Sequence, residues 1–306
     1  MRFNPKARLD TSRVRQSGRG GGSRAGGMPI PAGVGVGGGI GGIVLVVIFI
    51  VATQFLGGGG ADGAALDTSR MDDSDRYAEC ETGEDANNSA DCARVAVENS
   101  LFDYWSEALP DQGDRQFRAA ESITTFSGSV ATSCGNASSD VGPFYCPADE
   151  TIYLDTTFFE AVLERQLGGP GGDFVEPYVL AHEYGHHIQN LLGAMGRVKT
   201  QQGPTSDAVR LELQADCYAG MWTAAATRTE DDGGQELFAE LDQADITEAL
   251  DAAAAVGDDR IQQKTGGQVT EESWTHGSAR SRMRWFQTGF DEGTLAACDT
   301  WATNDL

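Results

Sequence analysis

Two histidines and a glutamate that could bind and use a metal ion lie within five consecutive residues. The run His182-Glu183-Tyr184-Gly185-His186 has the H-E-x-x-H spacing. Residues four apart share one face of a helix, so both imidazoles could reach one zinc ion, at about 2.0–2.1 Å from each nitrogen. Glu183 would lie beside the metal-bound water and could accept its proton as a general base. The run therefore predicts a metal centre that activates water.

Coincidence explains this run poorly. The chain has four histidines in 306 residues, and three of them lie between 182 and 187. The apolar residues 178–181 and Ile188 around them indicate a buried helix, and burying imidazoles beside a carboxylate costs free energy unless something satisfies them. His187 is rotated by roughly 140° from His182, so we expect it to be structural and not a ligand.

The third ligand must come from another part of the chain, because a catalytic zinc site keeps three protein ligands and one open position. The segment 211–217 carries two carboxylates one helical turn apart, Glu212 and Asp216, between apolar residues. We assign Glu212 as the third ligand. Asp216 would then accept the other ring N–H of a ligand histidine, with His182 as the expected donor. The swapped assignment, with Asp216 on the metal and Glu212 behind it, stays open.

His276 is a second candidate for catalysis beside Glu183. It lies in the sequence Thr275-His276-Gly277-Ser278, just before a predicted helix. An imidazole entering the site there could stabilise the oxyanion of a tetrahedral intermediate. A helix-capping or packing role is an equal alternative.

The elements that would position these residues can be read from hydrophobic period, caps and glycines. A long helix is predicted over 175–192, ending near Gly193, and a second one begins after Ser206 and runs to about 226. A third is predicted over 278–289. Further helices are expected over 93–105, 158–166 and 245–256, with strands over 119–127 and 151–155. This content predicts an α+β fold in which helices dominate. The strand near 148–155 is expected to be an edge that pairs with an extended peptide.

The N-terminal part differs from the rest and predicts a membrane protein. Residues 1–33 are basic and rich in glycine, which predicts a disordered cytoplasmic tail. Residues 34–56 lack charge and are long enough for a transmembrane helix. Residues 57–75 suggest a flexible acidic linker, and 76–306 a zinc metallopeptidase domain outside the membrane. A cleaved signal peptide, with small residues at 61–65, is the alternative.

Charge and cysteines narrow the function further. The net charge is −24, and the first 33 residues carry seven basic side chains against one acid, so the remainder carries −30. Such a surface repels nucleic acid, which we exclude as a partner. All six cysteines follow residue 79, which suggests disulfides in an oxidising compartment. We expect Cys80–Cys92 and Cys134–Cys146 from proximity and Cys217–Cys298 by elimination. A zinc–thiolate site is the alternative, but no C-x-x-C pair occurs.

Several spaced motifs resemble the putative neutral zinc metallopeptidase family of bacterial envelope proteins. The similar positions, in order, are 134–135, 142–149, 153–155, 181–189, 211–217, 257–259 and 275–278. The resemblance covers roughly 101–300 and leaves the basic tail outside. It implies a zincin-like metallopeptidase fold with glutamate as the third ligand, which matches the assignment made from the residues.

Together these features favour a membrane-anchored zinc metallopeptidase that cleaves a peptide or protein substrate, with one catalytic Zn²⁺. The alternative is a non-catalytic envelope protein that keeps the zinc for structure or partner binding. A third possibility is a hydrolase of another bond, such as an amide in cell-wall material. An intact Glu183 and a set of three ligands favour an open, catalytic site.

The two assignments of the third ligand predict opposite outcomes. If Glu212 binds the metal, Glu212→Ala loses the zinc while Asp216→Ala keeps most of it, because only the former removes a coordinating oxygen. Metal analysis of the purified variants measures this directly. The reverse pattern would establish the swapped assignment.

Overall fold

The computed structural model describes residues 1–17, 75–165, 167–169 and 171–306 of the chain. Within these ranges helices dominate, which confirms the predicted α+β class. The longer helices are α2 (Gly83–Asn88), α3 (Ala90–Gly113), α4 (Val175–Leu192), α5 (Asp207–Ala225), α6 (Gln243–Ala255), α7 (Asp258–Thr265) and α8 (Ala279–Glu292). A π-helical segment, η5, spans Phe159–Glu164, and single 3₁₀ turns are η3 (Asp75–Tyr77), η4 (Ser139–Val141), η6 (Ala194–Arg197), η7 (Ala226–Arg228) and η8 (Glu271–Ser273).

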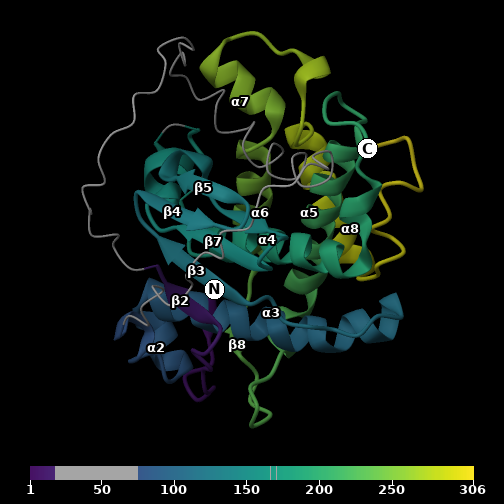
Figure 1. Ribbon diagram of the computed structural model, residues 1–306. Coiled ribbons are helices and arrows are strands. Elements are labelled where there is room, and N and C mark those ends of the chain that lie inside the picture. The colour runs from purple at the N-terminus through teal and green to yellow at the C-terminus, as the bar shows by residue number, and fades with distance from the viewer. Residues whose placement is uncertain (18–74, 166, 170) are drawn as a thin grey trace, which may run out of the picture.

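One four-stranded sheet lies beside the helices, in the order β2-β3-β7-β6 (Figure 1). Its strands are β2 (Val14–Gln16), β3 (Ser122–Phe126), β7 (Thr151–Asp155) and β6 (Phe144–Cys146). The first three are parallel, and β6 runs antiparallel to β7. Two smaller antiparallel pairs join β1 (Arg2–Phe3) to β8 (Phe238–Glu240) and β4 (Ser129–Thr132) to β5 (Gly135–Ser138).

The strand expected to be an edge is internal. Strand β7 is hydrogen-bonded to β3 on one side and to β6 on the other, and all five of its residues are buried. The outer strands are β2 and β6. The expectation was wrong because β6 has only three residues, too few for an alternating pattern to show in the sequence.

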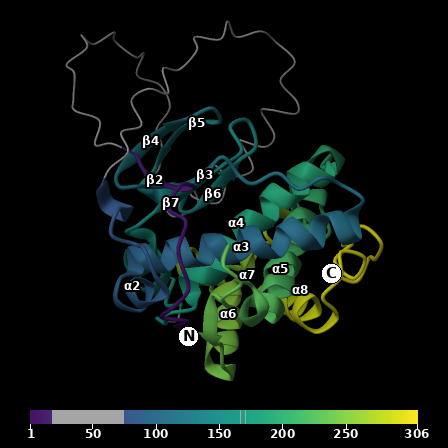
Figure 2. The ribbon, with the colours of Figure 1, turned by 90° about the horizontal axis from the view of Figure 1, so that it is seen from below.

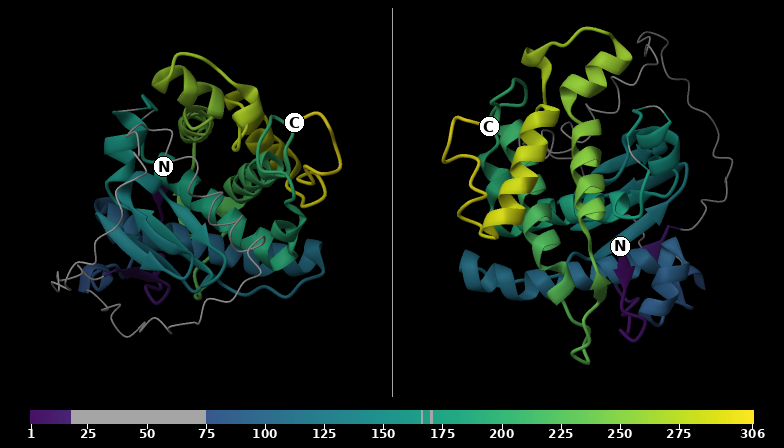
Figure 3. Two further views of the ribbon diagram at one scale, coloured as in Figure 1. Left: turned by 45° about the horizontal axis from the view of Figure 1, so that its top comes forward. Right: turned by 180° about the vertical axis from the view of Figure 1, so that it is seen from behind.

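Helix α5 lies between α4 and α8 and makes its most extensive contacts with them. The approach to α8 depends on two glycines. A Cβ built at Gly289 would lie 1.8 Å from the carbonyl oxygen of Cys217, and one at Gly220 would lie 2.0 Å from that of Phe286. No other residue allows these backbones so close together. Seen from behind, α8 and α6 run side by side across this face (Figure 3).

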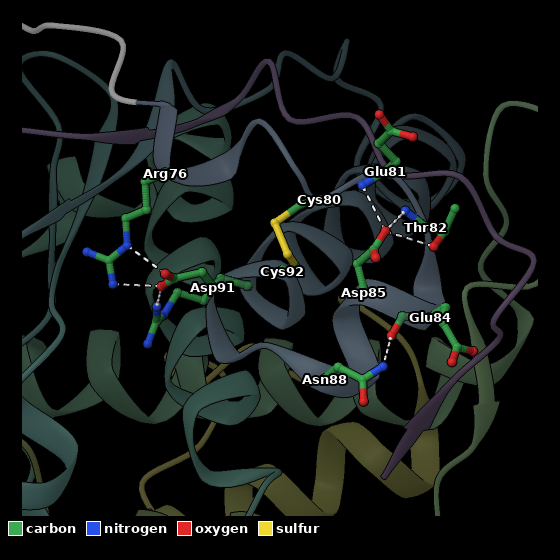
Figure 4. Close-up of a disulfide and its surroundings, with 10 residues drawn as sticks. Arg76, Cys80, Glu81, Thr82, Glu84, Asp85, Asn88, Asp91 and Cys92 are labelled. Carbon is green, nitrogen blue, oxygen red and sulfur yellow. Dashed lines mark hydrogen bonds and ion pairs between the residues drawn. A yellow bond between two sulfur atoms is a disulfide. The ribbon is translucent and has the colours of Figure 1, made fainter.

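The three predicted disulfides are all present: Cys80–Cys92, Cys134–Cys146 and Cys217–Cys298. The first joins the loop before α2 to the first turn of α3 (Figure 4). Beside it Arg76 donates two hydrogen bonds of 2.7 Å to the Asp91 carboxylate. The third joins the middle of α5 to the segment after α8. With all six cysteines paired, the zinc–thiolate alternative fails.

Residues 1–17, here called the N-terminal strap, are ordered and packed against the domain (Figure 2). The strap adds β1 to β8 and β2 to β3. Phe3 is 2% exposed, and its ring centroid lies 4.8 Å from that of Phe238. The amino group of Met1 lies 2.9 Å from Asp173 and 2.7 Å from Asp245. The prediction of a disordered tail is therefore wrong for these residues, because partners distant in sequence order them.

The position of the strap contradicts the predicted location. That prediction was a single-pass membrane protein with its N-terminus in the cytoplasm and its catalytic domain outside. A single crossing over 34–56 would place the strap and the domain on opposite sides, whereas β2 and β3 share one sheet. In the ranges that the structure describes, no helix is both long enough and apolar enough to span a bilayer. The predicted span 34–56, residues 18–33 of the predicted tail and residues 57–74 of the predicted linker lie outside the described residues.

Replacing the buried ring of the strap should destabilise the whole domain. Phe3→Ala is expected to lower the free energy of unfolding by about 3–5 kcal/mol, because the lost ring leaves a cavity against Phe238. Denaturant titration measures the loss. The matched control is Arg2→Ala, since Arg2 is 63% exposed and should change stability by less than about 0.5 kcal/mol. Equal stability of the two variants would contradict a docked strap.

Candidate metal centre

Helix α4 presents His182, Glu183 and His186 from its buried middle turns. The helix begins at Val175 and ends at Leu192, with Gly193 in the left-handed conformation (φ 74°), as the sequence predicts. The two imidazoles have ring centroids 4.9 Å apart and are each 6% exposed. Their spacing of four residues therefore places both rings on one side of α4.

The small residue between the histidines lets α5 approach this side. A Cβ at Gly185 would lie 3.1 Å from the carbonyl oxygen of Ala215 and 3.2 Å from its Cα, tighter than ordinary contact. Helix α5 itself starts as predicted, with Ser206 accepting a hydrogen bond from the amide of Val209. Glu212 lies about one turn before Ala215 on α5, so this close approach of the helices brings its side chain near the two histidines.

The carboxylate of Glu212 meets both imidazoles. Its Oε2 lies 3.3 Å from Nε2 of His182, and its Oε1 lies 3.5 Å from Nε2 of His186. One ligand atom from each of the three residues lies within 4.8 Å of the others. Ligands about 2.0–2.2 Å from a tetrahedral zinc ion are roughly 3.4 Å apart. The donor types and separations therefore fit a zinc ion.

Asp216 lies behind His182 and fixes its ring. Its Oδ1 lies 2.8 Å from Nδ1 of His182 and accepts a hydrogen bond of 2.6 Å from the Tyr178 hydroxyl. Arg282 of α8 donates to both carboxylate oxygens at 2.8 Å. Burial alone would raise the pKa of Asp216, but the Arg282 guanidinium and His182 lower it to about 2. The ionised Asp216 accepts a hydrogen bond from Nδ1–H of His182, so Nε2 is the nitrogen that faces Glu212.

His186 is fixed in the same way by a neutral side chain. Its Nδ1 lies 2.8 Å from Oε1 of Gln189, which can only accept. The amide nitrogen of Gln189 donates to the Leu211 carbonyl at 2.7 Å and so cannot turn toward the ring. The proton of His186 therefore lies on Nδ1, and its Nε2 also faces the cluster.

Glu183 is buried without a partner. It is 7% exposed, and its Oε2 has no hydrogen-bond partner in the described parts of the chain. Burial raises the pKa of this carboxyl group. Burying a carboxylate with an unsatisfied oxygen costs free energy, and this oxygen makes no hydrogen bond that would offset the cost. Its position next to His182 indicates a group kept for chemistry at the cluster.

His276 lies in the loop before α8, which begins at Ala279. Its Nδ1 lies 2.8 Å from the hydroxyl of Thr275. Burial lowers the pKa of His276, but the negative charges of Glu212 and Asp258 raise it overall. The loop packs on α5 beside Glu212, because a Cβ at Gly277 would lie 3.1 Å from Val209 and 3.4 Å from Leu213. The catalytic role of His276 stays a prediction.

His187 belongs to a different network, away from the cluster. Its Nε2 donates to the carbonyl of Arg118 at 2.7 Å, and its Nδ1 lies 3.1 Å from the hydroxyl of Tyr145. The same hydroxyl accepts a hydrogen bond from Asn190. This contact set agrees with the structural reading and also ties β6, which carries Tyr145, to α4.

Three supporting residues were not found from the sequence: Tyr178, Gln189 and Arg282. The first two could have been found by spacing, because Tyr178 lies four residues before His182 and Gln189 three after His186. Arg282 had a weaker signal in the sequence. It is a charged residue on the same helical face as Trp285 and Phe286, which are buried. Only the fold shows that it meets Asp216.

The cluster has the donor set of a divalent-metal centre, and the comparisons agree with that class. The chain belongs to the putative neutral zinc metallopeptidase family, whose sequence profile matches residues 1–301. The resemblance predicted from the motifs is thereby confirmed, and its expected extent is corrected, because the match includes the strap.

Two relatives illustrate the similarity. An uncharacterized protein of Mycobacterium tuberculosis is 48% identical over 252 residues, which cover 80% of this chain and 84% of the relative. The uncharacterized protein YpfJ of Escherichia coli K12 is 33% identical over 310 residues, covering 98% and 99% respectively. No solved structure matches the chain.

Removing the acceptor behind His186 should weaken metal binding without removing a ligand. Gln189→Leu is expected to lower zinc affinity by roughly 10–100-fold, because the ring loses the bond that fixes its tautomer. Competition with a chelator of known affinity measures the change. Asn190→Leu serves as the control, since Asn190 bonds Tyr145 and not a clustered histidine. Unchanged affinity in Gln189→Leu would contradict the assigned tautomer.

Proposed function

We propose that the chain is a zinc-dependent peptidase in which His182, His186 and Glu212 hold one zinc ion. The observation that carries this proposal is the convergence of the three ligand atoms within 4.8 Å, beside the unpartnered carboxylate of Glu183. The family to which the chain belongs supports the same activity. A zincin-like arrangement follows as part of the proposal, with both histidines on α4 and the glutamate on α5.

A zinc ion bound there would polarise a carbonyl group and lower the pKa of a coordinated water to roughly 7. Glu183 accepts a proton from the attacking water and returns it to the leaving amine. Its Oε2 makes no hydrogen bond within the described residues and is therefore free to accept one from water. His276 donates a hydrogen bond to the carbonyl oxygen as negative charge develops on it.

The substrate class we propose is a peptide or protein bound in an extended conformation. Strand β6 is the edge of the sheet nearest α4, and within the described ranges no strand pairs with its outer side. Its Tyr145 is bonded to Asn190 of α4, which fixes the edge relative to the site. Backbone pairing along β6 would orient a scissile bond without demanding particular side chains.

The non-catalytic alternative fits the site less well. Structural zinc sites are closed by four protein ligands and often use cysteine. The cluster offers three ligands, and all six cysteines are in disulfides. A purely structural site would also leave the buried Glu183 without a purpose.

Loss of the proposed base should slow turnover strongly while the metal stays bound. Glu183→Gln in the full chain is expected to slow cleavage of casein or a peptide library by roughly 10²–10⁴-fold. Zinc content should not change, because Glu183 is not among the clustered ligands. A chelator should stop the wild-type reaction, and added zinc should restore it. Glu107→Gln, an exposed site on α3, is the matched control. Cleavage that survives both the substitution and the chelator would end the proposal.

A further inference from the structure

The loop that carries His276 is held by a single carboxylate. Oδ2 of Asp258 accepts hydrogen bonds from three successive backbone amides, those of Thr275 at 2.7 Å, His276 at 2.7 Å and Gly277 at 2.9 Å. Asp258 is 3% exposed, and its own amide donates to the Gly277 carbonyl at 2.9 Å. Three amides that converge on one charged oxygen fix the backbone of a loop more firmly than bonds to a neutral acceptor.

The two residues on either side of Asp258 in the sequence hold the same segment of the chain. A Cβ at Gly257 would lie 2.4 Å from the amide nitrogen of Ala279, so only glycine allows this approach. Oδ1 of Asp259 accepts a hydrogen bond of 2.7 Å from the same amide. The residues 257–259 therefore hold the whole segment from Thr275 to the start of α8.

The far side of the loop rests on α5 around the proposed ligand. A Cβ at Gly277, whose φ is +88°, would lie 3.1 Å from Val209 and 3.4 Å from Leu213. These two residues flank Glu212 along α5. The imidazole of His276 bonds Thr275 through Nδ1, and among the described residues no hydrogen bond involves its Nε2. Its Nδ1 also lies 3.6 Å from Oδ1 of Asp258, so this carboxylate holds both the loop backbone and the ring.

We propose that Asp258 is a positioning residue that fixes the Thr275–Gly277 backbone so that His276 faces the reacting carbonyl beside Glu212. This inference rests on the proposed peptidase function. Asp258 does not touch the substrate and acts only through His276. Misplacement of a catalytic group by about 1 Å can cost roughly 10²-fold in rate, so the effect should be large.

A double-mutant cycle in the full chain tests the coupling. Asp258→Ala is expected to lower kcat about 10–100-fold, with KM and zinc content unchanged. In the His276→Ala background the same substitution should lower kcat by less than about threefold, because the residue through which it acts is gone. Equal losses in both backgrounds would overturn the proposal, as would an unchanged kcat. Asp251→Ala removes an exposed carboxylate of α6 and is the matched control.

A second measurement needs neither metal nor activity. In metal-free protein, hydrogen exchange of the amides of residues 275–277 should accelerate at least about tenfold in Asp258→Ala and stay unchanged in Asp251→Ala. Unchanged exchange in Asp258→Ala would show that the carboxylate does not hold the loop. If Asp258→Ala does not fold, Asp258→Asn keeps its volume and takes its place in both measurements. A wild-type chain that cleaves nothing would refute the peptidase function, and the exchange data would still decide whether Asp258 fixes the loop.

Discussion

The buried ion pair between Asp216 and Arg282 joins the three helices on which the site depends. Its carboxylate comes from α5 and its guanidinium from α8, and Tyr178 and His182 of α4 bond the same oxygen. Removing both charges from water is costly, and only their mutual bonds offset that cost. The pair is therefore a weak source of net stability but a strict condition on geometry, because any arrangement that separates the helices leaves a charge without a partner.

The orientation of the two imidazoles toward the metal site depends on the hydrogen bonds that their Nδ1 atoms make on the opposite side of each ring. Both clustered histidines have Nδ1 occupied, one by a charged acceptor and one by a neutral amide. The charged acceptor increases the electron density of the His182 ring more than Gln189 does for His186. The two imidazoles are thus equivalent in spacing but unequal as donors, and His182 is the stronger one.

Features that depend on residues close together in the sequence were predicted, and features that depend on residues far apart were missed. The bounds of α4 and the cap of α5 at Ser206 depend on residues within one or two turns, so local patterns predicted them. The carboxylates of Glu212 and Asp216 were found because they too are one turn apart. By contrast, Arg282 meets Asp216 across 66 positions, and β2 pairs with a strand more than a hundred residues later. Such contacts depend on tertiary packing, which no local pattern encodes. The strap was also concealed by its composition, since its basic residues outnumber the apolar anchors Phe3 and Val14.

The strap has a consequence for how the protein is made. Strand β1 contains residues 2 and 3 and pairs with β8 at 238–240. The ribosome releases the first partner long before it synthesises the second, so the earliest residues of the chain must wait until most of the polypeptide has emerged. Until then the aromatic ring at position 3 is exposed to solvent and to other nascent chains. Completion of the domain is thus delayed until residues 238–240 have emerged and can pair with residues 2 and 3.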